Sequence, residues 1–139
     1  MKRCLAVLAT LIGLSIGSSA QTCTTFPCVV ASVSLTDQIN GIGATPLYTP
    51  PVSGIFRISA YLSVRRVDTK PNAVWNIDVL WRDDQEARQA SYTISNAFSS
   101  AQSSTWVVQA VGGVPLLFKT RSMNGRVGYN LFIVVEQLQ

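Results

Sequence analysis

The stretch Pro50–Val64 reads PPVSGIFRISAYLSV. After its Pro-Pro-Val-Ser-Gly turn, every second residue from Phe56 to Val64 is apolar, and most of the residues between them are polar. Successive side chains of a β-strand point to opposite faces of the sheet, so this alternation is typical of a strand with one buried face. The pattern therefore predicts a strand with Phe56 facing a core and Arg57 facing outward. Gly54, which closes the turn, is expected to adopt a backbone conformation that other residues avoid.

The same two-residue period continues on both sides of this stretch. It predicts further strands at Val29–Leu35, within Ile39–Tyr48, and at Trp75–Trp81, Ala90–Ile94, Trp106–Ala110, Leu116–Phe118 and Val127–Val135. Polar or glycine-containing turns separate them, and no stretch has sustained helical periodicity. About eight antiparallel strands in a single domain predict an all-β fold, an antiparallel β-sandwich of the jelly-roll type.

Three segments resemble jelly rolls of the complement-component/tumour-necrosis-factor superfamily. Thr45–Leu62 is similar to the family's Pro…Gly-Leu-Tyr-Arg-Val-Ser-x-Tyr-Leu segment, Val107–Leu116 to its strand, glycine turn and strand, and Gly128–Glu136 to its closing strand. Such segments recur in phage tail proteins and in small exported bacterial proteins. The resemblance implies a homotrimer. The Gly-Asp of the family's later turn is Gly-Gly here, and because no family ligand motif is present, the resemblance identifies no binding residues.

The N-terminal residues 1–20 have the pattern of a cleaved signal peptide. Lys2-Arg3 precedes an apolar run of about 14 residues, and Ser18-Ser19-Ala20 supplies small residues for cleavage. A bilayer-spanning helix needs about 20 apolar residues, so we expect no membrane span in the mature chain. We expect a secreted, extracellular or periplasmic protein, with an N-terminal arm at residues 21–34 and the jelly-roll domain at 35–139.

Cleavage would leave two cysteines, Cys23 and Cys28, within the N-terminal arm. An even number of cysteines in an exported chain predicts a disulfide, here one that closes a short loop before the first strand. Because two cysteines without histidine cannot form a four-ligand site, structural zinc is not expected.

The chain contains no histidine, which excludes the Ser-His-Asp triad and the usual acid–base catalyst at neutral pH. We therefore expect a protein that is not an enzyme and has no cofactor. Removing Lys2 and Arg3 leaves nine basic residues against seven acidic ones. So small an excess, scattered along strands, does not indicate a nucleic-acid partner.

Two groups of residues are candidate sites. Asp83, Asp84 and Glu86 place three carboxylates in one turn, which is a weak candidate for Ca²⁺ because the spacing of a dedicated calcium loop is missing. A surface glycan or protein could contact residues expected at the surface, namely Tyr48, Tyr61, Arg57 and Arg65. Trp75, Trp81 and Trp106 share faces with aliphatic residues, so we assign them to the core.

Leu131–Val135 is apolar on both faces, so one face fills the core and the other needs a cover. A subunit interface would supply it, and a central strand covered within one subunit is the alternative. The sequence thus predicts a secreted, non-catalytic binding or assembly protein that forms a homotrimer. One alternative is a carbohydrate-binding module, which two coplanar, solvent-facing rings would favour. Another is a filament subunit that donates the Val29–Leu35 segment to a neighbour.

We predict that replacing both cysteines (Cys23→Ser with Cys28→Ser) leaves the fold intact, because the disulfide loop precedes the first core strand. Closing so short a loop contributes about 2 kcal/mol. The thermal transition, followed by circular dichroism, should therefore fall by less than about 15 °C. A larger fall would place the loop within the core.

Overall fold

The computed structural model describes residues 23–64, 74–95, 101–122 and 128–139. The predicted signal peptide and Arg65 lie outside these ranges. The strands are β1 (Cys28–Gln38), β2 (Thr45–Tyr48), β3 (Gly54–Val64), β4 (Val74–Arg82), β5 (Ala87–Ser95), β6 (Ala101–Ala110), β7 (Leu116–Ser122) and β8 (Tyr129–Gln137).

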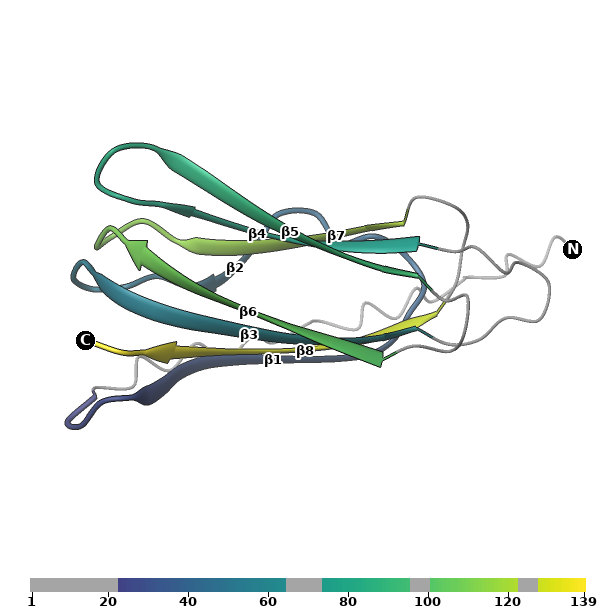
Figure 1. The fold of residues 1–139 in the computed structure, drawn as a ribbon, viewed down its shortest axis with the longest axis horizontal. Helices are drawn as coiled ribbons and strands as arrows, with labels where there is room; N and C mark the ends of the chain where they lie inside the picture. The colour runs from purple at the N-terminus through teal and green to yellow at the C-terminus, as the bar shows by residue number, and fades with distance from the viewer. Residues whose placement is uncertain (1–22, 65–73, 96–100, 123–127) are drawn as a thin grey trace, which may run out of the picture.

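These strands form two packed four-stranded sheets, ordered β1-β8-β3-β6 and β2-β7-β4-β5 (Figure 1). Every pairing is antiparallel, and most connections cross from one sheet to the other. This is the connectivity of a jelly roll, which confirms the predicted fold class. Within the described ranges, no helix is long and apolar enough to cross a membrane.

Strand β3 lies inside its sheet, between β8 and β6. Its alternation is confirmed, because the inward residues Phe56, Ile58, Ala60, Leu62 and Val64 are all buried. Gly54 begins this strand without a positive φ, so the expected unusual backbone conformation is wrong. Glycine is needed there for a close approach instead, since a Cβ atom would lie 2.6 Å from the carbonyl oxygen of Gln139.

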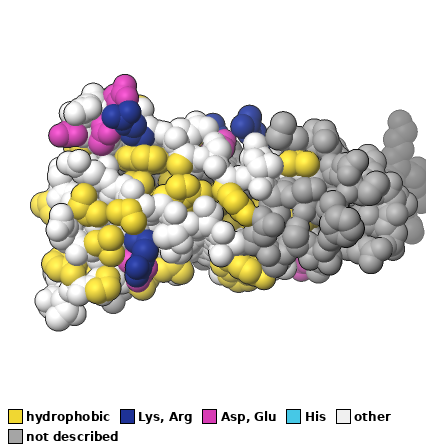
Figure 2. Space-filling view, in the orientation of Figure 1, with side chains coloured by type: hydrophobic (Ala, Val, Ile, Leu, Met, Phe, Trp, Pro, Cys, Tyr) yellow, Lys and Arg dark blue, Asp and Glu magenta, His cyan; other side chains and the backbone are white. Residues whose placement is uncertain are grey.

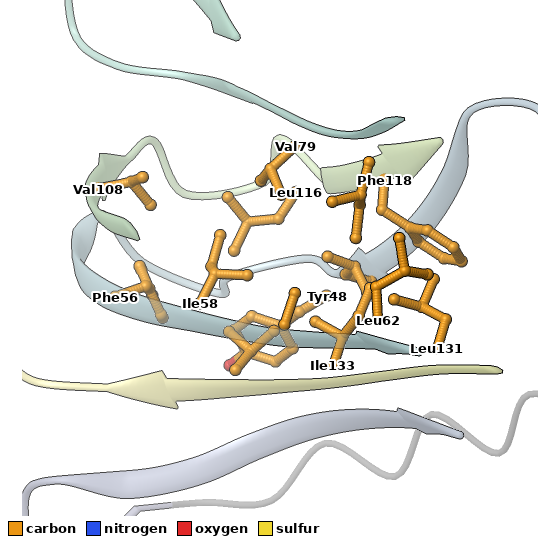
Figure 3. Packing of buried hydrophobic residues seen from close by; sticks show 14 of the residues in the cluster. Tyr48, Phe56, Ile58, Leu62, Val79, Val108, Leu116, Phe118, Leu131 and Ile133 are labelled. Atoms are coloured by element: carbon orange, nitrogen blue, oxygen red, sulfur yellow. The ribbon is translucent and has the colours of Figure 1, made fainter. Parts of the chain in front are cut away.

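The core fills the space between the sheets. Figure 3 shows Phe56, Ile58, Leu62 and Ile133 from one sheet facing Val79, Leu116 and Phe118 from the other. Trp75 is buried as predicted, with its ring centroid 4.2 Å from that of Tyr129. Trp81 and Trp106 pack against the same core while remaining partly exposed, which agrees with their assignment.

The buried Tyr129 ties the connection between β1 and β2 to the core. Its hydroxyl donates a hydrogen bond to the carbonyl oxygen of Asn40 at 3.0 Å and lies 2.7 Å from Thr120 Oγ1. The same Thr120 Oγ1 accepts a hydrogen bond from the backbone N–H of Ile42 at 2.9 Å. Burial raises the pKa of Tyr129, so the phenol stays protonated and keeps its donor.

Strand β1 departs from the predicted alternation at its start. The register against β8 shifts between Val29 and Ala31, so Val30 is the extra residue of a β-bulge. Val30 is consequently buried and Val29 is exposed, and the prediction that Val29 shares the face of Ala31 is wrong. Downstream of the bulge, Ala31, Val33 and Leu35 pack against the core as expected.

The surface position that the sequence predicts for Tyr48 is wrong. Its side chain is 8% exposed, with its ring centroid 5.8 Å from that of Phe56. The register between β2 and β7 shifts between Pro46 and Tyr48, and both Leu47 and Tyr48 are buried at this irregularity. Tyr48 is therefore removed from the surface residues available to a partner.

Cys23 and Cys28 form the predicted disulfide, with Cα atoms 6.1 Å apart. The loop that they close ends where β1 begins. β1 itself runs without interruption across the expected boundary at residue 34 and pairs with β8. The segment Val29–Leu35 is thus a strand of the chain's own sheet.

We predict that Phe56→Ala lowers the free energy of unfolding by about 3–5 kcal/mol, because it leaves a cavity at a fully buried site. Val52→Ala, at an exposed position outside the sheets, should cost less than about 0.5 kcal/mol. Denaturant midpoints of the two variants give the comparison. Equal midpoints would show that the core is not centred on β3.

Candidate functional site

The outward face of the sheet β1-β8-β3-β6, the lower layer in Figure 1, is the first candidate surface. We call it the β3/β8 face. It includes Val29, Ser32, Ser34, Ile55, Arg57, Ser59, Tyr61, Ser63, Ser103, Thr105, Val107, Gln109, Asn130, Phe132, Val134 and Glu136. Among these positions, small polar residues and exposed apolar residues predominate, and Arg57 and Glu136 are the charged ones. The exposed Asp37 lies beside the face, where its backbone N–H donates to Asn130 Oδ1 at 2.8 Å.

Two aromatic rings lie near the middle of this face. Tyr61 on β3 and Phe132 on β8 are directly opposite in register, with ring centroids 6.1 Å apart. Both side chains are exposed, which confirms the surface position predicted for Tyr61. Their planes are tilted by 46°, so they do not form the flat platform that stacks on a sugar ring.

The charges on the β3/β8 face neutralise each other. Arg57 donates two hydrogen bonds to Glu136, from Nε to Oε2 at 2.6 Å and from Nη2 to Oε1 at 2.9 Å. These hydrogen bonds hold the pKa of Glu136 below its usual value. The pair is flanked in register by Val107 on β6 and Val29 on β1, both exposed. A predicted ligand residue, Arg57, is therefore engaged within its own chain.

The outward face of the other sheet has a different chemistry. This β4/β7 face includes Asn76, Asp78, Leu80, Arg82, Gln89, Ser91, Thr93, Leu117, Lys119 and Arg121. At its centre Asp78 is completely buried, and it accepts a hydrogen bond from Ser91 Oγ at 2.6 Å. Sequence reasoning missed this residue. The alternation of β4 places it opposite the inward Ile77, which predicts exposure, and no local signal indicates that neighbours cover it.

The three carboxylates proposed for Ca²⁺ lie at the turn between β4 and β5, where Figure 2 shows charged side chains of both signs gathered. Asp83 Oδ1 accepts hydrogen bonds from the backbone N–H groups of Gln85 and Glu86, at 2.9 and 2.7 Å. Arg88 donates to Asp83 Oδ2 at 2.6 Å and also pairs with Glu86. Two of the three carboxylates are thus bound by an arginine. Across the described ranges, no group of three or more acidic or cysteine side chains could hold a metal ion.

Comparisons with known proteins assign no family to the chain. No protein-family model matches the chain, and no curated protein matches it in sequence. The solved structure described as the PRD1 vertex protein P5 matches with 12% identity and a TM-score of 0.48, over 81% of this chain and 99% of that one. An Eiger TNF from S. frugiperda matches with 11% identity and a TM-score of 0.41, over 78% and 92%. A family 16 carbohydrate-binding module matches with 6% identity and a TM-score of 0.37, over 73% and 72%.

The β4–β5 turn yields a pH-dependence prediction. The N–H of Glu86 and the guanidinium of Arg88 lower the pKa of Asp83 to about 2, below the value of about 3.9 in an unfolded chain. The contribution of the ionised Asp83 carboxylate to folding stability is therefore complete above about pH 4 and is lost as the pH falls through about 2.

The measurement is the denaturation midpoint between pH 7 and pH 2. We expect Asp83→Asn to lower the midpoint most near neutral pH, and the difference from wild type to shrink below about pH 4. Asp84→Asn, at the exposed neighbouring residue, is the matched control and should follow the wild-type curve. If the midpoint of Asp83→Asn stayed the same distance below that of wild type at every pH, the lowered pKa of Asp83 would be contradicted.

Proposed function

We propose that the protein is a non-catalytic assembly protein that acts outside the cytoplasm as a homotrimer, with the β3/β8 face as the contact between copies. The observation that carries this proposal is the composition of that face. Four of its positions, Val29, Tyr61, Val107 and Phe132, are large hydrophobic side chains exposed to solvent. Exposed apolar residues that share one surface of a soluble protein are typical of an interaction site.

The charge pattern supports the same contact. Burying an unpaired charge in an interface costs free energy, whereas a fully hydrogen-bonded pair is tolerated. Arg57 and Glu136 already satisfy each other, so burial of the face leaves neither of them without a partner. Ser59 and Thr105, whose hydroxyl oxygens lie 3.3 Å apart, share one hydrogen bond. The β4/β7 face, with Asp78, Lys119 and Arg121, has no such balance.

The number of copies comes from the sequence resemblance, which implies three. Export is supported by the predicted signal peptide and by the disulfide between Cys23 and Cys28. The filament alternative has less support, because Val29–Leu35 pairs with β8 of its own chain and would have to leave it to be donated. The carbohydrate-binding alternative lacks the coplanar exposed rings that would favour it.

The test uses multi-angle light scattering of the mature chain at micromolar concentration. We expect three times the mass of one chain. Phe132→Asp and Val107→Asp should each shift the protein to monomers, because every copy would bury an unpaired carboxylate in the contact.

Val52→Asp is the matched control for Val107→Asp. The two valines have similar exposure, 62% and 64%, but Val52 lies outside the β3/β8 face. Val52→Asp should therefore keep the trimer mass. A monomeric wild type, or a trimer that survives Phe132→Asp, would refute the proposed contact.

A further inference from the structure

The β4/β7 face carries two cations that share a single buried carboxylate. Lys119 Nζ lies 3.5 Å and Arg121 Nε lies 3.7 Å from Asp78 Oδ2. Asp78 is directly opposite Lys119 in the register of β4 and β7, and Arg121 is the next residue of β7 on the same face. One negative charge thus faces two positive ones, so this cluster has an excess positive charge.

The hydrogen-bond donors of these cations are not used by Asp78. Both nitrogen–oxygen distances exceed the range of about 2.7–3.2 Å for an N–H···O bond, and Oδ2 has no hydrogen-bond partner among the described residues. The side chains of Lys119 and Arg121 are 35% and 59% exposed, whereas that of Asp78 is 0% exposed. The charge of Asp78 therefore attracts both cations to this part of the sheet without using their hydrogen-bond donors.

Neutral donors and acceptors extend from this cluster along the neighbouring strand. Ser91 and Thr93 of β5 lie opposite Asp78 and Asn76 in register, and Gln89 lies opposite Leu80. The side chains of Gln89, Ser91 and Thr93 are all exposed. The Ser91 hydroxyl donates its proton to Asp78 and accepts a hydrogen bond from Gln89 Nε2 at 3.2 Å, so Thr93 and the remaining amide groups of Gln89 are left for a ligand. Two cations next to a row of hydroxyl and amide groups match a ligand that combines acidic groups with many hydroxyl groups.

We propose that Lys119 and Arg121 bind the carboxylate or sulfate groups of an acidic polysaccharide, while Gln89 and Thr93 contact its hydroxyl groups. Charge-assisted hydrogen bonds from lysine and arginine are the strongest contacts that such a surface can form. The described positions of this face include no aromatic ring for base stacking, which single-stranded nucleic acids require. A peptide partner needs buried aromatic or apolar anchors, and this polar row supplies no pocket for them.

This inference goes beyond the proposed assembly function, because it uses the opposite sheet. In a trimer joined through the β3/β8 faces, the β4/β7 faces lie on the sheet away from the contact (Figure 1). A polymer long enough to reach more than one copy of the cluster would bind more tightly than at a single site.

The experiment measures binding of the full mature chain to immobilised polygalacturonate, dextran sulfate and neutral dextran at low salt. The carboxylate and sulfate polymers distinguish the two sources of the acidic group. We expect binding to at least one of them, no binding to dextran, and weaker binding as salt rises. Arg121→Gln should weaken the affinity about tenfold, the loss expected for one charge-assisted contact. It leaves Lys119 beside Asp78, so the buried carboxylate keeps a counter-charge.

Arg82→Gln is the control for position on this face, since Arg82 is an exposed cation on the same outward face, opposite Ala87 and four residues along β4 from Asp78. It should retain the wild-type affinity. Equal losses for Arg82→Gln and Arg121→Gln would show only general charge attraction and would overturn the site. Binding to neither acidic polymer, or tighter binding to duplex DNA or phosphatidylglycerol vesicles, would also overturn it. Light scattering on the same samples reports assembly separately, so failure of the trimer and failure of this site give different results.

Discussion

The fold depends on burial of the inner face of β3. Phe56, Ile58 and Leu62 lie on the central pair of their sheet and contact residues of the opposite sheet, such as Leu116 and Phe118 (Figure 3). Because β3 pairs along nearly its whole length with both β6 and β8, its position fixes the register of the sheet. Side chains alternate strictly in a strand, so a register fixed for the inner face also fixes the outer one.

The consequence is two outer faces with opposite chemistry. On β3 and β8, the residues between the core positions include Tyr61, Phe132 and the Arg57–Glu136 pair. On β4 and β7, the corresponding positions are Asp78, Lys119 and Arg121. A jelly roll that assembles through one sheet and binds through the other would need this asymmetry. The physical reason is that an apolar, charge-balanced surface tolerates desolvation, and a surface with excess charge remains solvated and attracts ions.

Polar groups inside the sandwich show how the irregular connections are held. Tyr129 is buried beside Trp75, yet its hydroxyl reaches Thr120 and the carbonyl oxygen of Asn40. A buried hydroxyl without a partner is costly, so this network favours one path for the chain between β1 and β2. The turn between β4 and β5 is held similarly, by Asp83 accepting hydrogen bonds from two backbone N–H groups and from Arg88.

The sequence by itself determined the all-β class, the inward face of β3, the burial of Trp75 and the exposure of Tyr61. Each of these follows from a two-residue period, which is a local property of a strand. Only the tertiary structure decided the positions of Val29, Tyr48 and Asp78. A bulge turns Val30 inward, a register shift against β7 accompanies the burial of Tyr48, and residues of β5 and β7 surround Asp78. Bulges, register shifts and cross-strand neighbours arise from pairing between distant segments, so no local pattern in the chain reveals them.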